Sequence, residues 1–158
     1  MKEILLTQGK AALVDDEDYE YLSQFKWCAR KERDDLFYAR RAVKGNVYYS
    51  MHRLILNAPK GMEVDHINGN GLDNQRSNLR LCTKSQNQHN SHIRQDNKSG
   101  FKGVHWVNKC KRWRAKITIH GTQIHLGHFR IPEQAALAYN KAAIKFHGEF
   151  ARINQVEW

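Results

Sequence analysis

The sequence predicts an α+β protein with more than one small hydrophobic core. Short stretches of alternating apolar and polar residues, separated by Gly and Asn, are typical of strands in small antiparallel sheets. One stretch with helical periodicity, residues 132–148, is long enough for a regular helix. A mean hydropathy of −0.76 and a hydrophobic content of 41% leave too little apolar material for a single large core across 158 residues.

Residues 1–50 predict short strands and one short helix. Residues 3–14 fit two strands around a turn at Gln8-Gly9. Residues 15–25 place acidic side chains before an apolar stripe, which predicts a short helix with acids in its first turn. Further strands are expected at residues 26–31, 36–43 and 47–50, with a loop over residues 31–35 and a hairpin turn at Gly45-Asn46.

A polar stretch rich in Asn, Gly and His lies between short apolar runs in residues 51–92. Residues 51–57 ("MHRLILN") fit either a short helix or a strand. Residues 61–67 ("GMEVDHI") predict a strand that leads into an Asn/Gly loop, and residues 77–83 ("SNLRLCT") predict a second strand or a turn. Residues 84–92 ("KSQNQHNSH") predict a short helix capped by Thr83 or Ser85.

The C-terminal part predicts a small sheet and one helix. Residues 91–100 are polar and are expected to form a linker, with a boundary near residue 95. Three strands are expected at residues 103–107, 112–119 and 122–129, followed by a helix with Pro132 in its first turn and Gly148 at its end. Alanines along the apolar stripe of this helix allow it to lie close to a sheet.

Alternation divides the two longer strands into an apolar and a polar face. On the first, Trp113, Ala115, Ile117 and Ile119 share one face, and Arg112, Arg114, Lys116 and Thr118 share the other. On the second, Ile124 and Leu126 are expected on one face, with Gln123, His125 and Gly127 opposite. The apolar faces would meet the helix, and the basic face would remain available to a partner.

The charge distribution favours a polyanionic partner. The net charge is +10 and the pI is about 9.7. Residues 98–158 contain 11 Lys and Arg against 3 Asp and Glu, whereas residues 1–97 contain 15 against 13. The C-terminal part therefore carries most of the positive charge, which favours nucleic acid over a membrane surface.

Membrane and disulfide classes are not expected. No apolar run approaches the roughly 18 residues of a membrane span, and the N-terminus turns acidic where a signal peptide would be apolar. The three cysteines, Cys28, Cys82 and Cys110, are far apart and form no C-x-x-C pair, so we expect reduced thiols rather than a zinc knuckle. These features indicate a cytosolic protein.

Asp65 and His66 suggest hydrolytic chemistry at the end of the predicted strand. Hydrolysis of a phosphodiester needs a base for water and a cation that offsets charge on the phosphate. An imidazole suits the first role, and carboxylate or amide oxygens suit a hard cation. Adjacent strand residues point to opposite faces, so a local bend or the hairpin edge must bring Asp65 and His66 to one site. The alternative is an ordinary polar hairpin, with a surface His66 and Asn78 capping a turn.

The segment "HRLILN…GMEVDHINGNGLDNQRSNLRLCTKSQNQHN" resembles the HNH nucleases, in their phage and homing-endonuclease branch, over about residues 50–92. The resemblance implies a ββα-metal core made of a hairpin and one helix. It implies His66 as the general base, and Asp65 and Asn87 as metal ligands. Asn78 would be the middle residue of the motif, holding the loop or orienting the imidazole of His66.

Departures from the usual family pattern bear on the metal. The third motif position is often His and is Asn87 here, so the implied ligands are all oxygens, which suits Mg²⁺ or Mn²⁺ better than Zn²⁺. His89 is the alternative for that position. His52 and Arg53 also fit the family pattern, and Arg53 would contact a phosphate, pack against the chain or form a local salt bridge. Arg76 and Arg80 are expected to contact the DNA backbone.

Residues 98–154 resemble the plant ethylene-response, APETALA-type DNA-binding domain, through "SGFKGVHW", "RWRAKI", "IHLGHF", "EQAALAYNKAAIKFHG" and "ARIN". That family reads DNA with a three-stranded sheet. The resemblance implies DNA contacts by Lys102, His105, Arg112, Arg114, Lys116, Thr118, Gln123 and His125. Several of these differ from the plant residues, so the plant target sequence does not transfer. The alternative is a solvated basic surface.

Taken together, these features predict a small phage or mobile-element DNA endonuclease, located in the host cytosol if a phage encodes it. The predicted fold is a β-rich N-terminal segment (1–49), an HNH core (50–94) and a three-stranded antiparallel sheet packed on one helix (95–158). The expected substrate is duplex DNA, and the expected cofactor is Mg²⁺ or Mn²⁺. A single site predicts nicking by a monomer, and a homodimer would be needed for a double-strand break. The rival hypotheses are a catalytically inert, sequence-specific DNA-binding regulator and a nuclease directed at RNA.

Overall fold

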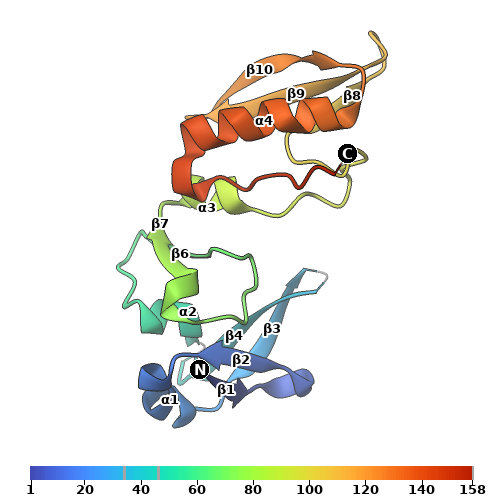
Figure 1. Ribbon diagram of the computed structural model, residues 1–158. Helices are drawn as coiled ribbons and strands as arrows, with labels where there is room; N and C mark the ends of the chain where they lie inside the picture. The colour runs from blue at the N-terminus through green and yellow to red at the C-terminus, as the bar shows by residue number, and fades with distance from the viewer. Residues whose placement is uncertain (34, 46, 158) are drawn as a thin grey trace. The chain divides into compact units, whose positions relative to one another are not determined.

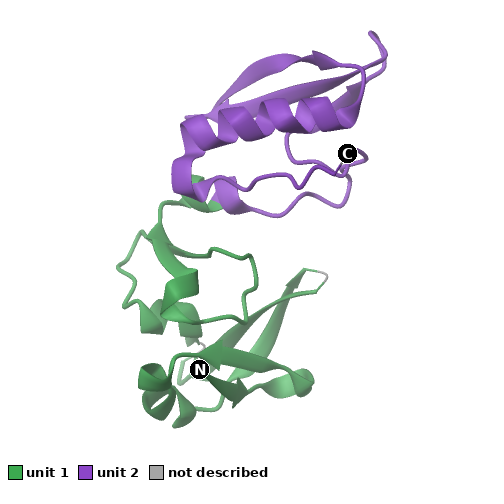
Figure 2. Cartoon of the chain, viewed as in Figure 1, with its two compact units in different colours: residues 1–87 green, residues 88–158 purple. Residues whose placement is uncertain are grey.

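The chain folds into two compact units, residues 1–87 and 88–158 (Figure 2). The structure, a computed structural model, describes residues 1–33, 35–45 and 47–157. The mixture of small sheets and helices is the α+β class that the sequence predicts. Asn46, half of the expected hairpin turn, lies outside the described residues.

The first unit contains three small antiparallel sheets and short helices. In chain order its elements are β1 (Lys2–Leu5), η1 (Thr7–Gly9), β2 (Ala11–Val14), α1 (Asp16–Ser23), β3 (Cys28–Arg33), β4 (Leu36–Val43), β5 (Val47–Ser50), α2 (Met51–Ile55), β6 (Glu63–His66), η2 (Arg76–Asn78) and β7 (Leu79–Cys82). The sheets are β1-β2, β3-β4-β5 and β6-β7. Residues 51–55, which the sequence left open between helix and strand, are helical.

One expectation for the first unit is wrong in detail. The strand expected to end at Lys31 continues to Arg33, and the loop is correspondingly shorter. A bulge between Lys31 and Arg33 is the reason, because it allows Arg33 to pair with Leu36 after Lys31 has paired with Phe37. Alternation in the sequence does not reveal such an inserted residue.

A single hydrophobic core connects the elements of the first unit. Its buried members come from β1, β2, α1, β3, β4, α2, β6 and β7, and include Val14, Leu22, Met51, Val64 and Leu79. The burial of each large side chain contributes on the order of 1.5–3 kcal/mol. The N-terminal sheets and the hairpin β6-β7 therefore stabilise one another.

The loop after β6 is fixed to β2 by backbone hydrogen bonds. The amide of Leu13 donates to the carbonyl of Leu72 at 2.8 Å, and the amide of Asn74 donates to the carbonyl of Leu13 at 2.8 Å. Gly71 lies where this loop meets β4, and a Cβ there would lie 2.6 Å from ring carbons of Tyr38. The loop can approach β4 so closely because residue 71 has no side chain.

The helix α3 (Lys84–Asn90) begins in the first unit and ends in the second. Thr83 caps it, as one of the two residues expected to do so. The amide of Gln86 donates to the Thr83 hydroxyl at 3.3 Å, and the amide of Thr83 donates to Oε1 of Gln86 at 2.8 Å. This reciprocal pair is a capping box, which fixes where α3 begins.

The second unit is a three-stranded antiparallel sheet with one long helix packed on it (Figure 1). Its elements are β8 (Val104–Val107), β9 (Arg112–Ile119), β10 (Thr122–Phe129), α4 (Pro132–His147) and η3 (Gly148–Phe150), with sheet order β10-β9-β8. Ala115 and Ile117 of β9 are buried against alanines of α4 and Tyr139. Pro132 begins the helix and Gly148, at φ 55°, ends it, as the sequence predicts.

The face assignment expected for β10 holds only in its first half. A bulge between His125 and Gly127 shifts the register, so Gly127 pairs with Ala115 and His128 pairs with Arg114. Paired residues share a face. Gly127 therefore lies on the helix-facing side, contrary to expectation, and His128 joins the basic face.

Residues 91–100 are less linker-like than their composition predicts. The Ser99 hydroxyl donates to the Val104 carbonyl at 2.9 Å, and the Asn97 side chain donates to the Phe101 carbonyl at 2.9 Å. Asn and Ser side chains bond readily to nearby backbone, which orders a segment that has few apolar residues. Over the described part of the chain, no helix is both long and apolar enough to cross a membrane.

Candidate active site and basic sheet face

Asp65 and His66 lie at the end of β6 and point to opposite faces. Asp65 pairs with Arg80 and His66 with Leu79 in a regular antiparallel register, so the two side chains start from opposite faces of the strand. Both residues are 5% exposed. In the two-stranded sheet β6-β7, β6 has a strand partner on one side. The other edge of β6, the open edge, has no strand partner among the described residues. A group bound at the open edge can contact side chains from both faces of β6.

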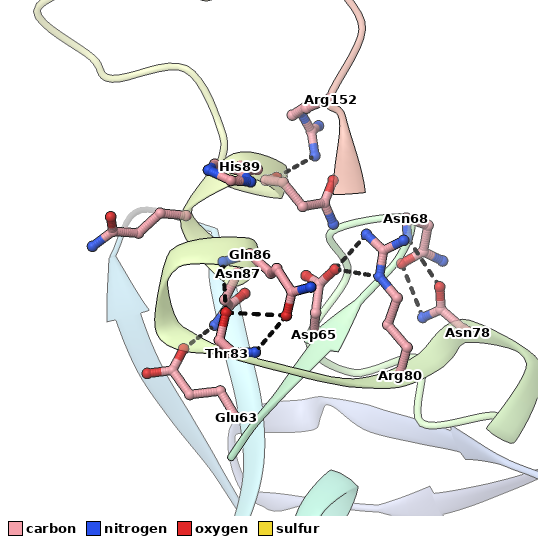
Figure 3. Close-up of polar contacts among 12 residues, drawn as sticks. Glu63, Asp65, Asn68, Asn78, Arg80, Thr83, Gln86, Asn87, His89 and Arg152 are labelled. Atoms are coloured by element: carbon pink, nitrogen blue, oxygen red, sulfur yellow. Dashed lines mark hydrogen bonds and ion pairs between the residues drawn. The ribbon is translucent and has the colours of Figure 1, made fainter. Parts of the chain in front are cut away.

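The carboxylate of Asp65 is buried in an ion pair with Arg80. Arg80 donates to Oδ2 of Asp65 from Nε at 2.8 Å and from Nη2 at 2.6 Å (Figure 3). The side chains of Arg80 and Asp65 are 13% and 6% exposed, respectively. Charge-assisted pairs of this kind fix the position of a carboxylate. Sequence reasoning assigned Arg80, like Arg76, to the DNA backbone, whereas the structure pairs Arg76 with Asp18 at 2.7 Å.

Asn87 reaches β6 at Glu63, a residue that sequence reasoning missed. The Asn87 amide donates to Oε2 of Glu63 at 2.6 Å (Figure 3). Glu63 and Asp65 are two residues apart and therefore share one face of β6, separated by about 6.6 Å along the strand. The side chain of Asn87 therefore reaches from α3 to the face of β6 that carries both carboxylates. The two-residue spacing from Asp65 is the signal that could have identified Glu63.

Asn78 organises the loop that follows β6. Its Oδ1 accepts a hydrogen bond from the Asn68 amide at 3.0 Å, and its Nδ2 donates to Oδ1 of Asn68 at 3.0 Å (Figure 3). Its Nδ2 also donates to the Asp73 carbonyl at 2.8 Å. Asn78 is buried, so these bonds satisfy its amide. Of the two roles expected for Asn78, these contacts correspond to holding the loop.

His66 lies among aromatic rings on the other face of β6. The His66 ring centroid is 5.0 Å from that of His52 and 5.6 Å from that of Tyr38. Its Nε2 lies 3.5 Å from Oδ1 of Asn74. Burial lowers the pKa of His66 from its ordinary value, while the contact with Asn74 and the charge of Asp65 act in the opposite direction. The ring is therefore kept neutral near pH 7, as a proton acceptor must be.

A pocket of about 470 Å³ lies beside β6. It is lined by Glu32, Tyr38, Arg40, Ser50, His52, Arg53, Glu63, Val64 and Asn87. The lining thus includes both the neighbours of His66 and the Glu63–Asn87 pair from the opposite face of β6. We therefore place the pocket at the open edge of β6, where the two faces meet.

The donor set on the carboxylate face fits a hard divalent cation. Asp65, Glu63 and Asn87 offer carboxylate and amide oxygens, the ligands that Mg²⁺ and Mn²⁺ prefer. Within residues 1–33, 35–45 and 47–157, no cluster of three or more His, Cys, Asp or Glu side chains is arranged to hold a metal ion. An ion here would accordingly need the amide oxygen of Asn87 in addition to the carboxylates.

Two residues assigned to DNA contact are engaged with the backbone of the chain itself. Arg53 donates to the carbonyls of Met62 at 2.6 Å, Ala58 at 3.1 Å and Pro59 at 3.1 Å. The ammonium group of Lys102 donates to the carbonyls of His89 at 2.6 Å and Ser91 at 2.7 Å. Lys102 thus caps the C-terminal end of α3, where carbonyls lack helical partners.

His89, the alternative to Asn87, is engaged within the second unit. Its ring stacks on that of His147 with a centroid distance of 3.6 Å and an interplanar angle of 7°. Burial, together with the neighbouring His147 and Lys102, lowers the pKa of His89 to about 4. Asn87, two residues earlier, contacts β6 at Glu63.

The basic residues expected on the sheet do share one face. His105 pairs with Arg114, Lys116 with His125, and Thr118 with Gln123. Lys116 also donates to Oε1 of Gln123 at 3.2 Å. The bulge in β10 adds His128 to this face, with its ring centroid 4.6 Å from that of His125. Trp106 and Trp113 pair on the opposite face, at 5.1 Å, where Trp113 packs against the core and Trp106 is 43% exposed.

Comparison with known proteins matches the hairpin and helix to a family. The family model described as HNH endonuclease matches residues 57–89. An HNH endonuclease of Acanthamoeba polyphaga mimivirus is 31% identical over 158 residues, covering 98% of this chain and 81% of the relative. Protein 3.8 of Escherichia phage T7 is 36% identical over 95 residues, covering 60% of this chain and 78% of the relative.

A second similarity is confined to part of the chain. The APETALA2-like protein 2 of Oryza sativa is 43% identical over 56 residues, which cover 35% of this chain and 13% of the plant protein. An AP2-like ethylene-responsive transcription factor of Arabidopsis thaliana is 41% identical over 58 residues, which cover 37% of this chain and 12% of that protein. No solved structure matches significantly.

The antiparallel hairpin, the helix and the matched motif define the class of this protein as a nuclease. The chain belongs to the HNH endonuclease family, and it is an enzyme that hydrolyses DNA. Members of this family generally depend on a divalent metal ion.

Proposed function

We propose that β6, β7 and α3 form a ββα-metal site that hydrolyses phosphodiester bonds in duplex DNA, with His66 as general base. Asp65 and Asn87 would hold Mg²⁺ or Mn²⁺, and one site per chain would nick one strand. The observation that supports this proposal most directly is the contact between Asn87 and Glu63. Glu63 and Asp65 are two residues apart on β6, so a contact of Asn87 with Glu63 supports a shared site for Asp65 and Asn87.

The mechanism uses the neutral imidazole of His66 as a proton acceptor. Water attacks phosphorus as His66 takes its proton, and the 3′ oxygen leaves. A bound divalent ion would offset the negative charge that develops on the phosphate. Asn78 holds the loop that follows His66, and Arg80 holds Asp65. Because His66 is covered by Tyr38 and His52, a small shift of these rings would be needed for water to reach it.

We assign recognition of duplex DNA to the basic face of the β8-β9-β10 sheet. This face presents His105, Arg112, Arg114, Lys116, Thr118, Gln123 and His125, with His128 beside them. A sheet face of this size fits a major groove. Arg53 and Lys102 are better explained as contacts that order the chain itself.

The test is cleavage of supercoiled plasmid in Mg²⁺, with EDTA as the metal-free control. We expect relaxed circles from the wild type, none in EDTA, and none from His66→Asn. His120→Asn is the matched control, since His120 is exposed on the β9-β10 turn. This variant should cleave the plasmid as the wild type does. Absence of relaxed or linear product under every divalent metal would instead favour the inert DNA-binding regulator.

The nucleic acid itself is tested by competition at fixed salt. Duplex DNA should displace a labelled duplex more effectively than structured RNA does. Stronger competition by RNA would contradict the assignment of DNA as the substrate of the basic sheet face.

A further inference from the structure

We propose that the pocket at the open edge of β6 is the binding site of the scissile phosphate, and that Arg40 of β4 and His52 of α2 bind its non-bridging oxygens. The proposal rests on the hydrolytic function assigned above. It gives the sheet β3-β4-β5 a direct part in the reaction, beyond support of the nuclease core.

Arg40 carries an unsatisfied donor at this pocket. Its Nε is buried and has no hydrogen-bond partner among the described residues. A buried donor without a partner costs on the order of 1–3 kcal/mol, and a bound ligand that offers an acceptor would remove this cost. A guanidinium group offers planar, paired donors that match the oxygens of a phosphate. The guanidinium carbon of Arg40 also lies 5.7 Å from the ring centroid of Tyr48.

Arg41 provides an internal comparison on the other face of β4. Its Nε is also buried without a partner among the described residues. Its guanidinium lies closer to aromatic rings than that of Arg40 does, at 3.7 Å from the ring centroid of Phe25 and 5.5 Å from that of Tyr49, so cation–π contact accounts for more of its position. Arg41 does not line the pocket, whereas Arg40 does.

His52 places a second unsatisfied donor or acceptor in the same pocket. Its Nδ1 is buried and lacks a partner within the part of the chain that the structure describes. The ring is held edge-to-face against His66 at 5.0 Å and against Tyr38 at 5.7 Å. His52 therefore both lines the pocket and contacts the ring of the general base, so it connects the bound phosphate with the residue that activates water.

The pocket lining carries both signs of charge, as a site for a phosphodiester and a cation requires. Glu63, hydrogen-bonded to Asn87, belongs to the carboxylate face that would hold the cation. Arg40 and His52 line the part of the pocket formed by β4 and α2, and Glu32 of β3 also contributes to the lining. A phosphate between them would accept bonds from Arg40 and His52 while the cation neutralises its other oxygens.

The principal test is single-turnover cleavage of duplex DNA by Arg40→Gln in the full-length protein. Loss of one donor to a reacting phosphate typically lowers the rate about 10²–10³-fold. We expect a loss of that size at saturating enzyme, with no change in DNA affinity, and partial recovery in Arg40→Lys. Lys44→Gln, an exposed residue of the same hairpin, makes the same change in charge and should leave the rate unchanged.

The outcomes separate this proposal from the assignment of His66. Wild-type rates in Arg40→Gln together with an inactive His66→Asn would overturn the phosphate site and leave the general base intact. An active His66→Asn would overturn the proposed function itself. A loss of DNA affinity in Arg40→Gln, without a slower rate at saturation, would also contradict a role at the reacting phosphate.

A measurement on the wild type covers the case in which Arg40→Gln fails to fold. In EDTA, where no DNA should be cut, the Nε–H resonance of Arg40 should shift when a short duplex is added, and the imidazole of His52 should shift with it. The Nε–H resonance of Arg41 serves as the control and should not move. Equal shifts of Arg40 and Arg41, or no shift of either, would overturn the proposal.

Discussion

At the scale of single residues, the site is governed by buried charge. Asp65 is almost fully buried and is neutralised by Arg80, and the two form the pair that any metal ion must join or disturb. A buried ion pair adds little stability by itself, because desolvation offsets the attraction. Removal of one partner is costly, because the other charge then remains buried and unpaired.

We predict that Arg80→Met lowers the free energy of unfolding by about 3 kcal/mol in EDTA, the cost typical of a broken buried pair. In Mg²⁺ the deficit should shrink, because a cation beside Asp65 would compensate its charge. Chemical denaturation in the two buffers measures this difference. The matched control is Arg76→Met, because the side chain of Arg76 is 45% exposed and paired with Asp18 and Glu17. This variant should cost less than about 1 kcal/mol. An identical deficit in EDTA and Mg²⁺ would argue against a metal ion at Asp65.

The buried imidazoles predict a dependence of stability on pH. Burial and the neighbouring His66, Arg53 and Arg40 lower the pKa of His52 to about 3, and burial lowers the pKa of His66 as well. Between an unfolded pKa of about 6.5 and these lower folded values, the unfolded chain binds protons that the folded chain does not. Stability should therefore be fully present above about pH 6.5 and decline as the pH falls toward 3.

Thermal unfolding across this pH range, compared with His52→Gln, measures the contribution of His52. The variant removes one of the two imidazoles, so its stability should decline less steeply between about pH 6.5 and 4. Parallel slopes in the two proteins would show that His52 is not buried in its neutral form.

At the scale of elements, α3 is short and depends on its caps. Seven residues are too few for a helix to be stable alone. The capping box of Thr83 and Gln86 begins α3, and Lys102 satisfies the carbonyls at its end. Because Asn87 lies in the middle of this helix, the caps determine how rigidly its amide is held.

We predict that Thr83→Ala lowers the free energy of unfolding by about 1 kcal/mol, the usual cost of removing an N-cap, and also slows DNA cleavage. The control is Ser85→Ala, because Ser85 was the alternative cap by sequence and is exposed in the first turn of α3. It should leave stability and cleavage close to those of the wild type. Chemical denaturation measures the stability of the two variants, and plasmid nicking measures their activity. Equal effects of the two substitutions would contradict the role of Thr83 as the cap that holds α3.

At the scale of the whole molecule, the catalytic motif and most of the positive charge fall in different compact units. The family match lies in residues 57–89, whereas the excess of Lys and Arg lies in residues 98–158. Binding to phosphates through Lys and Arg depends strongly on salt, because it releases counterions from DNA. Substitutions of Lys and Arg in residues 98–158 should thus change the affinity for DNA, whereas substitutions in residues 57–89 should change the rate of cleavage.

We predict that Arg114→Gln with Lys116→Gln weakens duplex binding and reduces the slope of log affinity against log salt by about 0.9 for each phosphate that the variant no longer neutralises. Cleavage at saturating protein should be unchanged. Lys141→Gln with Lys145→Gln removes the same charge from exposed positions of α4 and is the control. Fluorescence anisotropy of a labelled duplex over a salt series measures the affinity and the salt slope of both double variants. Equal weakening by the two pairs would indicate a general effect of charge and no specific role for the sheet face.

Local patterns predicted much of the fold because most elements here are short and regular. Alternation located β9, the Pro132 and Gly148 signals bounded α4, and Thr83 marked the start of α3. The bulges in β3 and β10 were not predicted, because an inserted residue depends on the partner strand. Gly127 was consequently assigned to the wrong face.

The candidate site was predictable only in part, for the same reason. The motif identified Asp65, His66, Asn78 and Asn87 because their spacing along the chain is distinctive. Their contacts involve residues that the motif does not contain. Glu63 binds Asn87, Arg80 binds Asp65, and the rings of Tyr38 and His52 cover His66.

The amino-acid sequence by itself determined the class of fold, the family motif and the charge asymmetry, since all three are encoded in residue type and local spacing. Tertiary structure alone decided which polar groups meet, because hydrogen bonds and ion pairs join residues distant along the chain. It paired Asp65 with Arg80, directed Lys102 to the end of α3, and left Nε of Arg40 and Nδ1 of His52 unsatisfied, among the described residues, at one pocket. Burial makes these pairings consequential, because a buried polar group must find a partner in the fold or in its ligand.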